Sequence, residues 1–265
     1  MNLIRKQLCF LTAMLAAASM HAAHAQATMQ PLQTSSFLMT EYPEYNGNTQ
    51  AQKVSLLSDA GGVTKLGMTS QASSLSMDTQ GTSMSNGDLY TGVFDISVRN
   101  GYRVTGFSFA ATLVGVLQVA EAPPGASMVQ PGNARNSGSM EASALTGPHG
   151  QRIAGESFRQ ESLDGTQNIL LQGMGLSLTD PFTMFISGMS YVDAQLGQYR
   201  MNGPDYSCDA SLPAYASYRF VNPTLTIFTS PVPEPGTYAM LLAGLALCGA
   251  AGLRRRRGAR SGAPA

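Results

Sequence analysis

The residues that could do chemistry in this chain of 265 residues are few and far apart. His149 is the one histidine that follows the first 25 residues, so a histidine-rich metal site has no support and a Ser-His-Asp triad would depend on a single imidazole. No serine lies in a Gly-x-Ser-x-Gly sequence, which is a common setting for a hydrolase nucleophile. A lone histidine beside Pro148 is more typical of a solvated loop. We therefore expect no catalytic residue and no enzyme activity.

Paired carboxylates are the next candidates, because two carboxyl groups on either side of a glycosidic bond can cleave it. Glu156 with Glu161, and Asp88 with Asp95, are such pairs in the sequence. Residues 26–232 contain fifteen acidic residues, so pairs of this kind arise by chance, and solvated surface carboxylates explain them more simply. Hydrolysis of a polysaccharide stays an alternative without a defined site.

Two further patterns would indicate a bound ion or cofactor, and both are incomplete. Asp78, Asn86 and Asp88 could offer oxygen atoms to Ca²⁺, as loops of extracellular β-domains do, but they lack EF-hand spacing. Gly173-Met174-Gly175 resembles the start of a phosphate-binding turn, yet the third glycine and a following helix are missing, which favours a strand end. We expect neither a metal nor a cofactor.

Tyrosines are plentiful, whereas tryptophan is absent from the chain. Sugar-binding sites use flat aromatic platforms, for which tryptophan is best suited, so its absence counts against a strong lectin. Most of the tyrosines are expected to pack or to line strand edges. Those outside the C-terminal segment are Tyr42, Tyr45, Tyr90, Tyr102, Tyr191, Tyr199, Tyr206, Tyr215 and Tyr218.

The elements that would position these residues are predicted to be β-strands. Residues 93–98 alternate polar and apolar side chains with period two, and residues 103–109 are rich in β-branched and aromatic types. Asn100-Gly101 between them is a favoured two-residue hairpin turn. Pairing across this turn would place Phe94 opposite Phe107, with both rings on one face of a sheet.

Further runs of the same kind predict one antiparallel β-sandwich, with a jelly roll as one form of it, over roughly residues 40–230. Asp164-Gly165, Asp180-Pro181 and Asn222-Pro223 act as turn signals between the strands. Residues 122–150 are rich in Pro, Gly, Ser and Asn and are predicted to form a long loop or an edge excursion. The other predicted strands are Lys53–Leu57, Leu113–Val119, Ile169–Met174, Phe182–Met189, Tyr218–Val221 and Thr224–Thr229.

The C-terminal part contains three segments of different physical character in a fixed order. Pro233-Glu234-Pro235 favours an extended, exposed chain, because each proline fixes φ and removes a backbone donor. Residues 236–253 carry no charge and would reach roughly 27 Å as a helix, close to the hydrocarbon thickness of a bilayer. Arg254 to Arg257 follow and are expected to stay cytoplasmic. A marginal transmembrane helix is predicted, with the preceding chain on the other side of the membrane.

The N-terminal part has the organisation of a secretory signal peptide. Arg5 and Lys6 form a charged region, residues 8–20 form an apolar region, and Ala23 and Ala25 supply the small residues of a cleavage site. Cleavage after Ala25 is expected. Export through the Sec translocon follows from this prediction.

The tail and the signal peptide together resemble the PEP-CTERM sorting system of Gram-negative bacteria that produce exopolysaccharide. The resemblance implies that a membrane protease of the exosortase type recognises the tail, removes it near the Pro-Glu-Pro motif and passes the protein to the cell surface or the extracellular polysaccharide. The matching residues are Val232, Pro233, Glu234, Pro235 and Gly236, then the apolar segment 236–253, then Arg254, Arg255, Arg256 and Arg257.

Together with the strand and signal-peptide patterns, this resemblance divides the chain into four predicted regions. They are a signal peptide at 1–25, an exported β-sandwich domain at 26–230, a sorting signal at 231–257 that contains the helix 236–253, and a short cytoplasmic tail at 258–265. The resemblance covers about 30 residues and leaves the role of the β-domain open.

Charge and cysteine content change when the two ends are set aside. Residues 26–232 contain nine basic and fifteen acidic residues, a net charge of −6, so no nucleic-acid partner is expected. Cys208 is the only cysteine in this region, which excludes an internal disulfide. Burial of Cys208 as a small apolar side chain is favoured over an intermolecular bridge.

Three hypotheses remain from the sequence. The favoured one is a non-enzymatic exported protein with a structural, matrix or adhesive role at the cell surface. The second is a carbohydrate-binding or hydrolytic β-sandwich acting on exopolysaccharide, which predicts a concave face with clustered tyrosines and paired carboxylates. The third is a tail-anchored periplasmic protein that no sorting protease processes.

Overall fold

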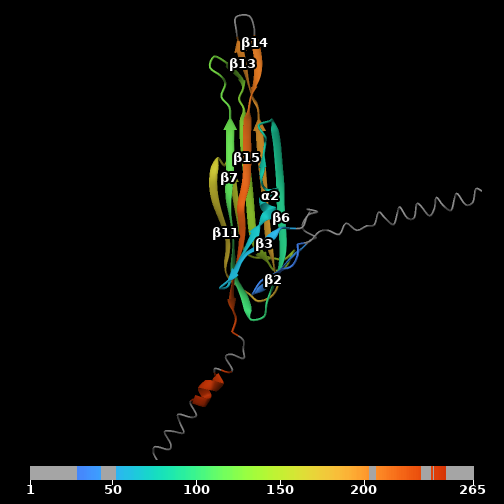
Figure 1. The fold of residues 1–265 in the computed structure, drawn as a ribbon, viewed down its shortest axis with the longest axis vertical. Helices are drawn as coiled ribbons and strands as arrows, with labels where there is room; N and C mark the ends of the chain where they lie inside the picture. Colours follow the sequence, from blue (N-terminus) through green and yellow to red (C-terminus); the bar gives the residue numbers. More distant parts are fainter. Residues whose placement is uncertain (1–28, 43–51, 203–206, 234–239, 241, 249–265) are drawn as a thin grey trace, which may run out of the picture.

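The computed structural model describes residues 29–42, 52–202, 207–233, 240 and 242–248. Within them, two large antiparallel sheets face each other across one hydrophobic core, and a small third sheet extends from one end of the elongated molecule (Figure 1). This arrangement confirms the predicted all-β antiparallel sandwich. The predicted signal helix lies outside the described residues.

Sheet A is the first of the two large sheets. Each of its neighbouring strand pairs is antiparallel. In the order in which they are hydrogen-bonded, its strands are β1 (Leu32–Gln33), β2 (Phe37–Glu41), β6 (Met84–Val98), β12 (Phe182–Gln195), β9 (Asn133–Leu145) and β10 (Arg152–Glu161).

Sheet B is the second large sheet and contains the last strand before the C-terminal segment. In hydrogen-bonded order, its strands are β11 (Gly165–Leu178), β7 (Tyr102–Val119), β15 (Ala214–Pro231), β4 (Val63–Met68) and β3 (Val54–Ala60), and β5 (Met77–Asp78) pairs with β15. A short helix, α2 (Thr69–Ser74), follows β4 in the chain and contacts β15.

The third sheet, sheet C, lies at the end of the molecule away from the exit of the C-terminal segment (Figure 1). Its order is β14 (Ser207–Leu212), β13 (Gly197–Asn202) and β8 (Ser127–Gln130).

The core forms because successive side chains of a strand point to opposite faces of its sheet. In β12, for example, Met184 and Ile186 are fully buried, whereas Met189 is about half exposed on the other face. The inward faces of sheets A and B interlock as one cluster. Its largest fully buried side chains include Phe37, Phe94 and Ile96 from sheet A, and Phe107, Phe109 and Leu113 from sheet B.

The predicted hairpin across Asn100-Gly101 is wrong, although the turn itself is present. The Tyr102 amide donates to the Arg99 carbonyl at 3.1 Å, and Gly101 has a φ of 82°. However, β6 belongs to sheet A and β7 to sheet B, so Phe94 pairs with Met184 instead of Phe107. The turn crosses between the layers, because both strands carry long apolar faces that must meet across the core.

The prediction of a long loop or edge excursion at residues 122–150 is also wrong. Residues 133–145 form β9, which lies between β12 and β10 inside sheet A. Its inward residues are small or flexible, and Met140, Ala142 and Ala144 are buried. The composition resembles a loop, but the alternation of burial is that of a strand.

The last strand, β15, runs without interruption through a predicted turn. The separately predicted strands 218–221 and 224–229 both belong to it, and its register with β7 shifts between Val221 and Thr224. Asn222 has a φ of 51° at this point. Asn222-Pro223 therefore marks a β-bulge, where a proline within a sheet is tolerated.

Asn136 links the two large sheets from inside the core. It is 2% exposed on β9, and its side-chain amide donates to the Leu163 carbonyl at 2.7 Å and to the Ser217 carbonyl of β15 at 2.8 Å. Its side-chain oxygen accepts from the Leu163 amide at 2.7 Å. One buried side chain thus satisfies three backbone groups, two on Leu163 and one on Ser217.

A second link lies at the edge of the molecule, between β3 and the turn after β1. The Asp59 carboxylate accepts from the Ser35 amide at 2.6 Å and from the Thr64 hydroxyl at 2.7 Å. Partial burial opposes its ionisation, but these hydrogen bonds and the charge of Arg99 outweigh that effect and hold the pKa of Asp59 below its usual value.

Candidate functional site

The junction between the sandwich and the C-terminal segment is fixed by backbone hydrogen bonds. The end of β15 pairs with the start of β7, with Pro231 opposite Tyr102. The Val232 amide then donates to the Gly101 carbonyl at 2.8 Å. Val232, the first residue of the predicted motif, is half-buried and makes the last of these bonds, whereas Pro233, where the Pro-Glu-Pro core begins, is exposed.

The turn between β6 and β7 lies directly beside this exit. Arg99 and Arg103 flank it and are exposed. The Arg103 guanidinium donates through Nε to the Ser230 hydroxyl at 2.9 Å, which holds the Arg103 side chain against the end of β15. The exit and the turn occupy one end of the molecule, opposite sheet C (Figure 1).

Only part of the predicted sorting segment is described. Residues 240 and 242–248 are helical, and their apolar side chains Met240, Leu242, Leu245 and Leu247 are each more than 60% exposed. Within the described ranges, no helix is both long enough and apolar enough to span a bilayer. The other predicted residues, Glu234, Pro235, Gly236, Arg254 to Arg257, Ala23 and Ala25, lie outside the described residues.

A family model for the PEP-CTERM protein-sorting motif matches residues 231–257. The chain carries a PEP-CTERM protein-sorting motif. The match begins at the last residue of β15, which is where the fold ends. No curated protein and no solved structure matches the chain.

The PEP-CTERM motif implies export and membrane-associated sorting by an exosortase, a membrane enzyme. The geometry of the junction suits this processing. An extended chain at the end of a strand, rather than a segment packed in the sandwich, is what a protease can bind. Pro233, the first residue of the Pro-Glu-Pro core, is accessible in the structure.

A groove crosses the outer face of sheet A. It has a volume of about 560 Å³. The register places Leu89, Met189, Ser139 and Arg159 in one row across four strands. Ser187, Glu141 and Ser157 form the next row.

Glu141 is the one carboxylate among the described residues that line this groove. The Ser143 hydroxyl donates to it at 2.7 Å, and Arg152 lies 3.7 Å away. Three serine hydroxyls, one carboxylate and one guanidinium can bind hydroxyl-rich ligands by hydrogen bonds. They do not form the pair of opposed carboxylates that glycoside hydrolysis needs.

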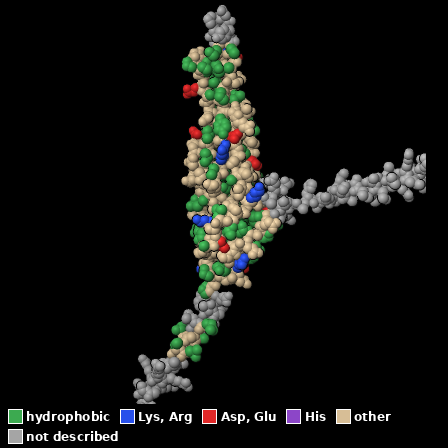
Figure 2. All heavy atoms as spheres, viewed as in Figure 1, with side chains coloured by type: hydrophobic (Ala, Val, Ile, Leu, Met, Phe, Trp, Pro, Cys, Tyr) green, Lys and Arg blue, Asp and Glu red, His purple; other side chains and the backbone are tan. Residues whose placement is uncertain are grey.

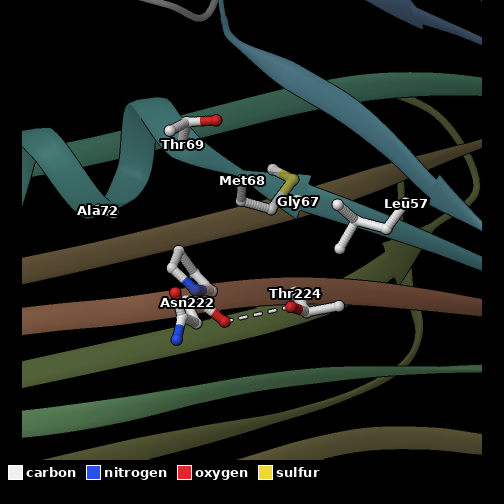
Figure 3. Close-up of a pocket in the computed structure, with 8 residues that line it drawn as sticks. Leu57, Gly67, Met68, Thr69, Ala72, Asn222 and Thr224 are labelled. Carbon is white, nitrogen blue, oxygen red and sulfur yellow. Dashed lines mark hydrogen bonds between the residues drawn. The ribbon is translucent and has the colours of Figure 1, made fainter.

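A smaller hollow lies between sheet B and α2, beside the bulge of β15 (Figure 3). Its volume is about 290 Å³. Figure 3 shows Asn222 and Thr224 on β15 facing Gly67 and Met68 on β4, with the Thr224 hydroxyl bonded to the Asn222 carbonyl at 3.1 Å. None of the described residues that line this hollow has an ionisable side chain, so they supply no general acid or base for catalysis.

The predicted calcium ligands are not brought together. Asp78 lies on β5 beside sheet B and faces Arg219 at 3.8 Å, in a hollow on the other side of α2. Asn86 and Asp88 are exposed on β6 of sheet A. Within the described part of the chain, no group of three or more histidine, cysteine or acidic side chains forms a metal site.

The predicted carboxylate pairs are likewise separated by the fold. Glu156 and Glu161 both lie on β10, five residues apart, so a regular strand directs them to opposite faces. Glu156 accepts from the Gln172 amide of β11 at 2.8 Å, and Glu161 pairs with Arg159 at 2.7 Å. Asp88 and Asp95 lie seven residues apart on β6, and Asp95 accepts from the Thr183 hydroxyl at 2.9 Å.

The remaining candidates have structural explanations or different surroundings from those predicted. His149 is exposed in the loop between β9 and β10, as expected. Gly173 lies inside β11, where any larger side chain would collide with the Phe107 ring. The strand is confirmed, but it continues to Leu178 instead of ending at this glycine pair. Cys208 was expected to be buried, but it is exposed on β14.

The tyrosines and charges of the sandwich do not gather at one place. Tyr90 and Tyr218 are fully buried, and desolvation raises the pKa of Tyr218 to about 12. Tyr191 is 40% exposed and shares a hydrogen bond of 2.7 Å with the Ser85 hydroxyl. On the face shown in Figure 2, basic and acidic side chains are scattered singly over the body.

Sequence reasoning missed the groove on sheet A, because the two rows of residues that line it come from strands that are distant in the chain.

Proposed function

We propose that this PEP-CTERM protein is a non-enzymatic structural or adhesive component of the cell surface or of the exopolysaccharide matrix. The match of the sorting motif to residues 231–257, directly after the last strand, carries the proposal. The signal peptide 1–25 delivers the chain to the Sec translocon. Residues 236–253 hold it in the inner membrane, with Arg254 to Arg257 on the cytoplasmic side, until an exosortase cleaves near Val232 to Gly236.

The surroundings of the candidate side chains support a non-enzymatic role. Glu161 and Asp95 are bound to partners in their own sheet, and Glu156 joins the edges of the two sheets. These contacts explain the carboxylates as structural groups. An extended two-sheet body with a removable anchor is suited to display or cohesion rather than turnover.

Substituting the motif is expected to block removal of the tail. We predict that the wild-type protein in the surface fraction of the native host lacks most of residues 236–265, whereas a variant with Pro233→Ala, Glu234→Ala and Pro235→Ala keeps them and stays in the membrane fraction. Intact-mass measurement on both fractions distinguishes the two forms. Glu121→Ala, an exposed carboxylate shortly before Pro123-Pro124, is the matched control and should be processed normally. An intact tail on wild-type surface protein would contradict sorting.

The groove on sheet A favours a second, more specific function, in which the sandwich binds polysaccharide. Ser139 lies at its centre, so Ser139→Arg should fill the groove and weaken binding to the host's own exopolysaccharide by about tenfold or more. Ser97→Arg, on the same strand as Leu89 and exposed, is the control and should bind normally. Co-sedimentation of the purified full chain with the polysaccharide measures both. Equal binding by the two variants would remove the groove from consideration.

A further inference from the structure

The length of chain between the fold and the predicted membrane segment limits how far the sandwich can lie from the bilayer. The Val232 amide is held by the Gly101 carbonyl at 2.8 Å, and the apolar segment begins at Gly236. Four residues span at most about 14 Å, even fully extended. The interfacial layer on one side of a bilayer is itself about 6 Å thick. Before the tail is removed, the turn at Gly101 therefore lies at or just above the lipid headgroups.

The side chains at this turn suit such a position. Arg99 and Arg103 are exposed on either side of Asn100-Gly101, and Tyr102 is half-buried between them. Arg103 uses Nε to bind the Ser230 hydroxyl, an uncharged partner, and its positive charge stays uncompensated by that bond. Arginines with a tyrosine are typical of membrane interfaces.

Two carboxylates lie near the arginines at this end. Asp59 is bound to the Ser35 amide and the Thr64 hydroxyl and interacts electrostatically with Arg99, whereas Arg103 is bonded to an uncharged partner. Asp180, in the loop between β11 and β12, is exposed. Residues 26–232 have a net charge of −6, which includes these two arginines, so the rest of the exported domain is acidic and is repelled by an anionic surface. The two arginines are therefore placed where they can orient the sandwich on the membrane.

We propose that the turn from Arg99 to Arg103 is a membrane-contact surface, in which both guanidinium groups bind the phosphates of anionic lipids while the tail is inserted. The inference rests on the proposed anchoring through residues 236–253. It gives this end of the sandwich a function during the period before the tail is cleaved. The sandwich would stand on this turn, with sheet C at the far end from the bilayer.

Hydrogen exchange on the full chain with its tail uncleaved, reconstituted in lipid nanodiscs, tests the proposal. Amides of residues 99–103 should exchange more slowly in phosphatidylglycerol nanodiscs than in phosphatidylcholine nanodiscs. The difference should fall by about fivefold for each arginine replaced in Arg99→Gln and Arg103→Gln. High salt should reduce it as well, because the contact is between exposed charges. Asp180→Asn should increase it.

Two controls separate charge from tethering. Arg135→Gln with Arg200→Gln removes two arginines from strands distant from the turn and should leave the protection of residues 99–103 unchanged. Inserting a flexible twelve-residue Gly-Ser spacer after Val232 adds about 20 Å of average reach, well beyond the Debye length at physiological salt, and should abolish the protection.

The outcomes distinguish this inference from the anchoring on which it rests. A full chain that fails to associate with nanodiscs would contradict the anchoring and the inference together. Association with equal exchange in both lipids would overturn the inference alone. Protection that appears only in membranes containing the exosortase would assign the turn to that protease instead of to lipid.

Discussion

Replacing Asn136 by leucine is expected to lower the free energy of unfolding by about 4 kcal/mol, the largest effect of any single polar substitution in the described sandwich. The side chain of Asn136 makes three hydrogen bonds of 2.7 to 2.8 Å, two with the backbone of Leu163 and one with the Ser217 carbonyl. Leucine has a similar volume but would leave these buried backbone groups unpaired, at about 1 to 3 kcal/mol each. These bonds join β9 of sheet A to β15 of sheet B and to the chain before β11. The substitution therefore removes hydrogen bonds that connect the two sheets.

Urea unfolding followed by circular dichroism measures this loss. Asn168→Ala is the matched control, since Asn168 accepts one hydrogen bond of 2.8 Å from Thr112 in an exposed setting and should cost about 0.5 kcal/mol or less. Asn136→Asp retains the acceptor for the Leu163 amide but loses both donors, and it should also destabilise strongly. A loss below about 1 kcal/mol for Asn136→Leu would show that the contacts are not maintained in solution.

The segment around Asn136 shows why composition misled the loop prediction. Asn and Gly are depleted in strands on average, because they pack poorly on an ordinary half-buried sheet surface. In β9 the neighbouring layers leave little room, so small residues are required. Gly138 makes this visible, since an added Cβ there would lie 2.4 Å from the Tyr218 ring. A strand formed by close approach cannot be told from a loop by residue type alone.

The turn at Asn100-Gly101 illustrates a different limit. Its residues determine that the chain reverses, and the structure contains that reversal. They do not determine which partner each strand finds, since the partners come from distant parts of the sequence. β6 pairs with β2 and β12, and β7 pairs with β11 and β15. Local sequence therefore predicted these two strands and the fold class, but not the pairing of the strands.

The same distinction separates the two kinds of candidate site. The sorting motif is a continuous segment whose parts act in chain order, so it could be identified from residues 231–257 directly. The groove on sheet A joins Leu89, Ser139, Arg159 and Met189 from four strands. Nothing in the spacing of those residues indicates that they meet. Their rows exist only once the register is known.

Substituting Gly138 by alanine is expected to cost about 2 to 3 kcal/mol. An ideal Cβ at this position would lie 2.4 Å from three atoms of the Tyr218 side chain, a distance that real contacts essentially never show. Tyr218 is fully buried and packs edge-on against Phe220 with ring centroids 5.7 Å apart, so its ring has little freedom to move. Thermal and urea unfolding measure the loss. Gly147→Ala is the control and should be nearly neutral, because no atom lies within 4 Å of the added Cβ.

A double-mutant cycle with Tyr218→Leu tests whether this collision is the cause. Leucine at position 218 removes the ring and creates space, and it is destabilising alone because a large buried side chain is lost. The Tyr218 hydroxyl has no hydrogen-bond partner among the described residues, so its removal adds little to that cost. Combined with Gly138→Ala, the loss should be smaller than the sum of the two single losses by about 1 to 3 kcal/mol. Strict additivity would mean that alanine at 138 destabilises β9 through its backbone and not through contact with the ring. The packing of sheet A on sheet B would then not depend on the absence of a side chain at this position.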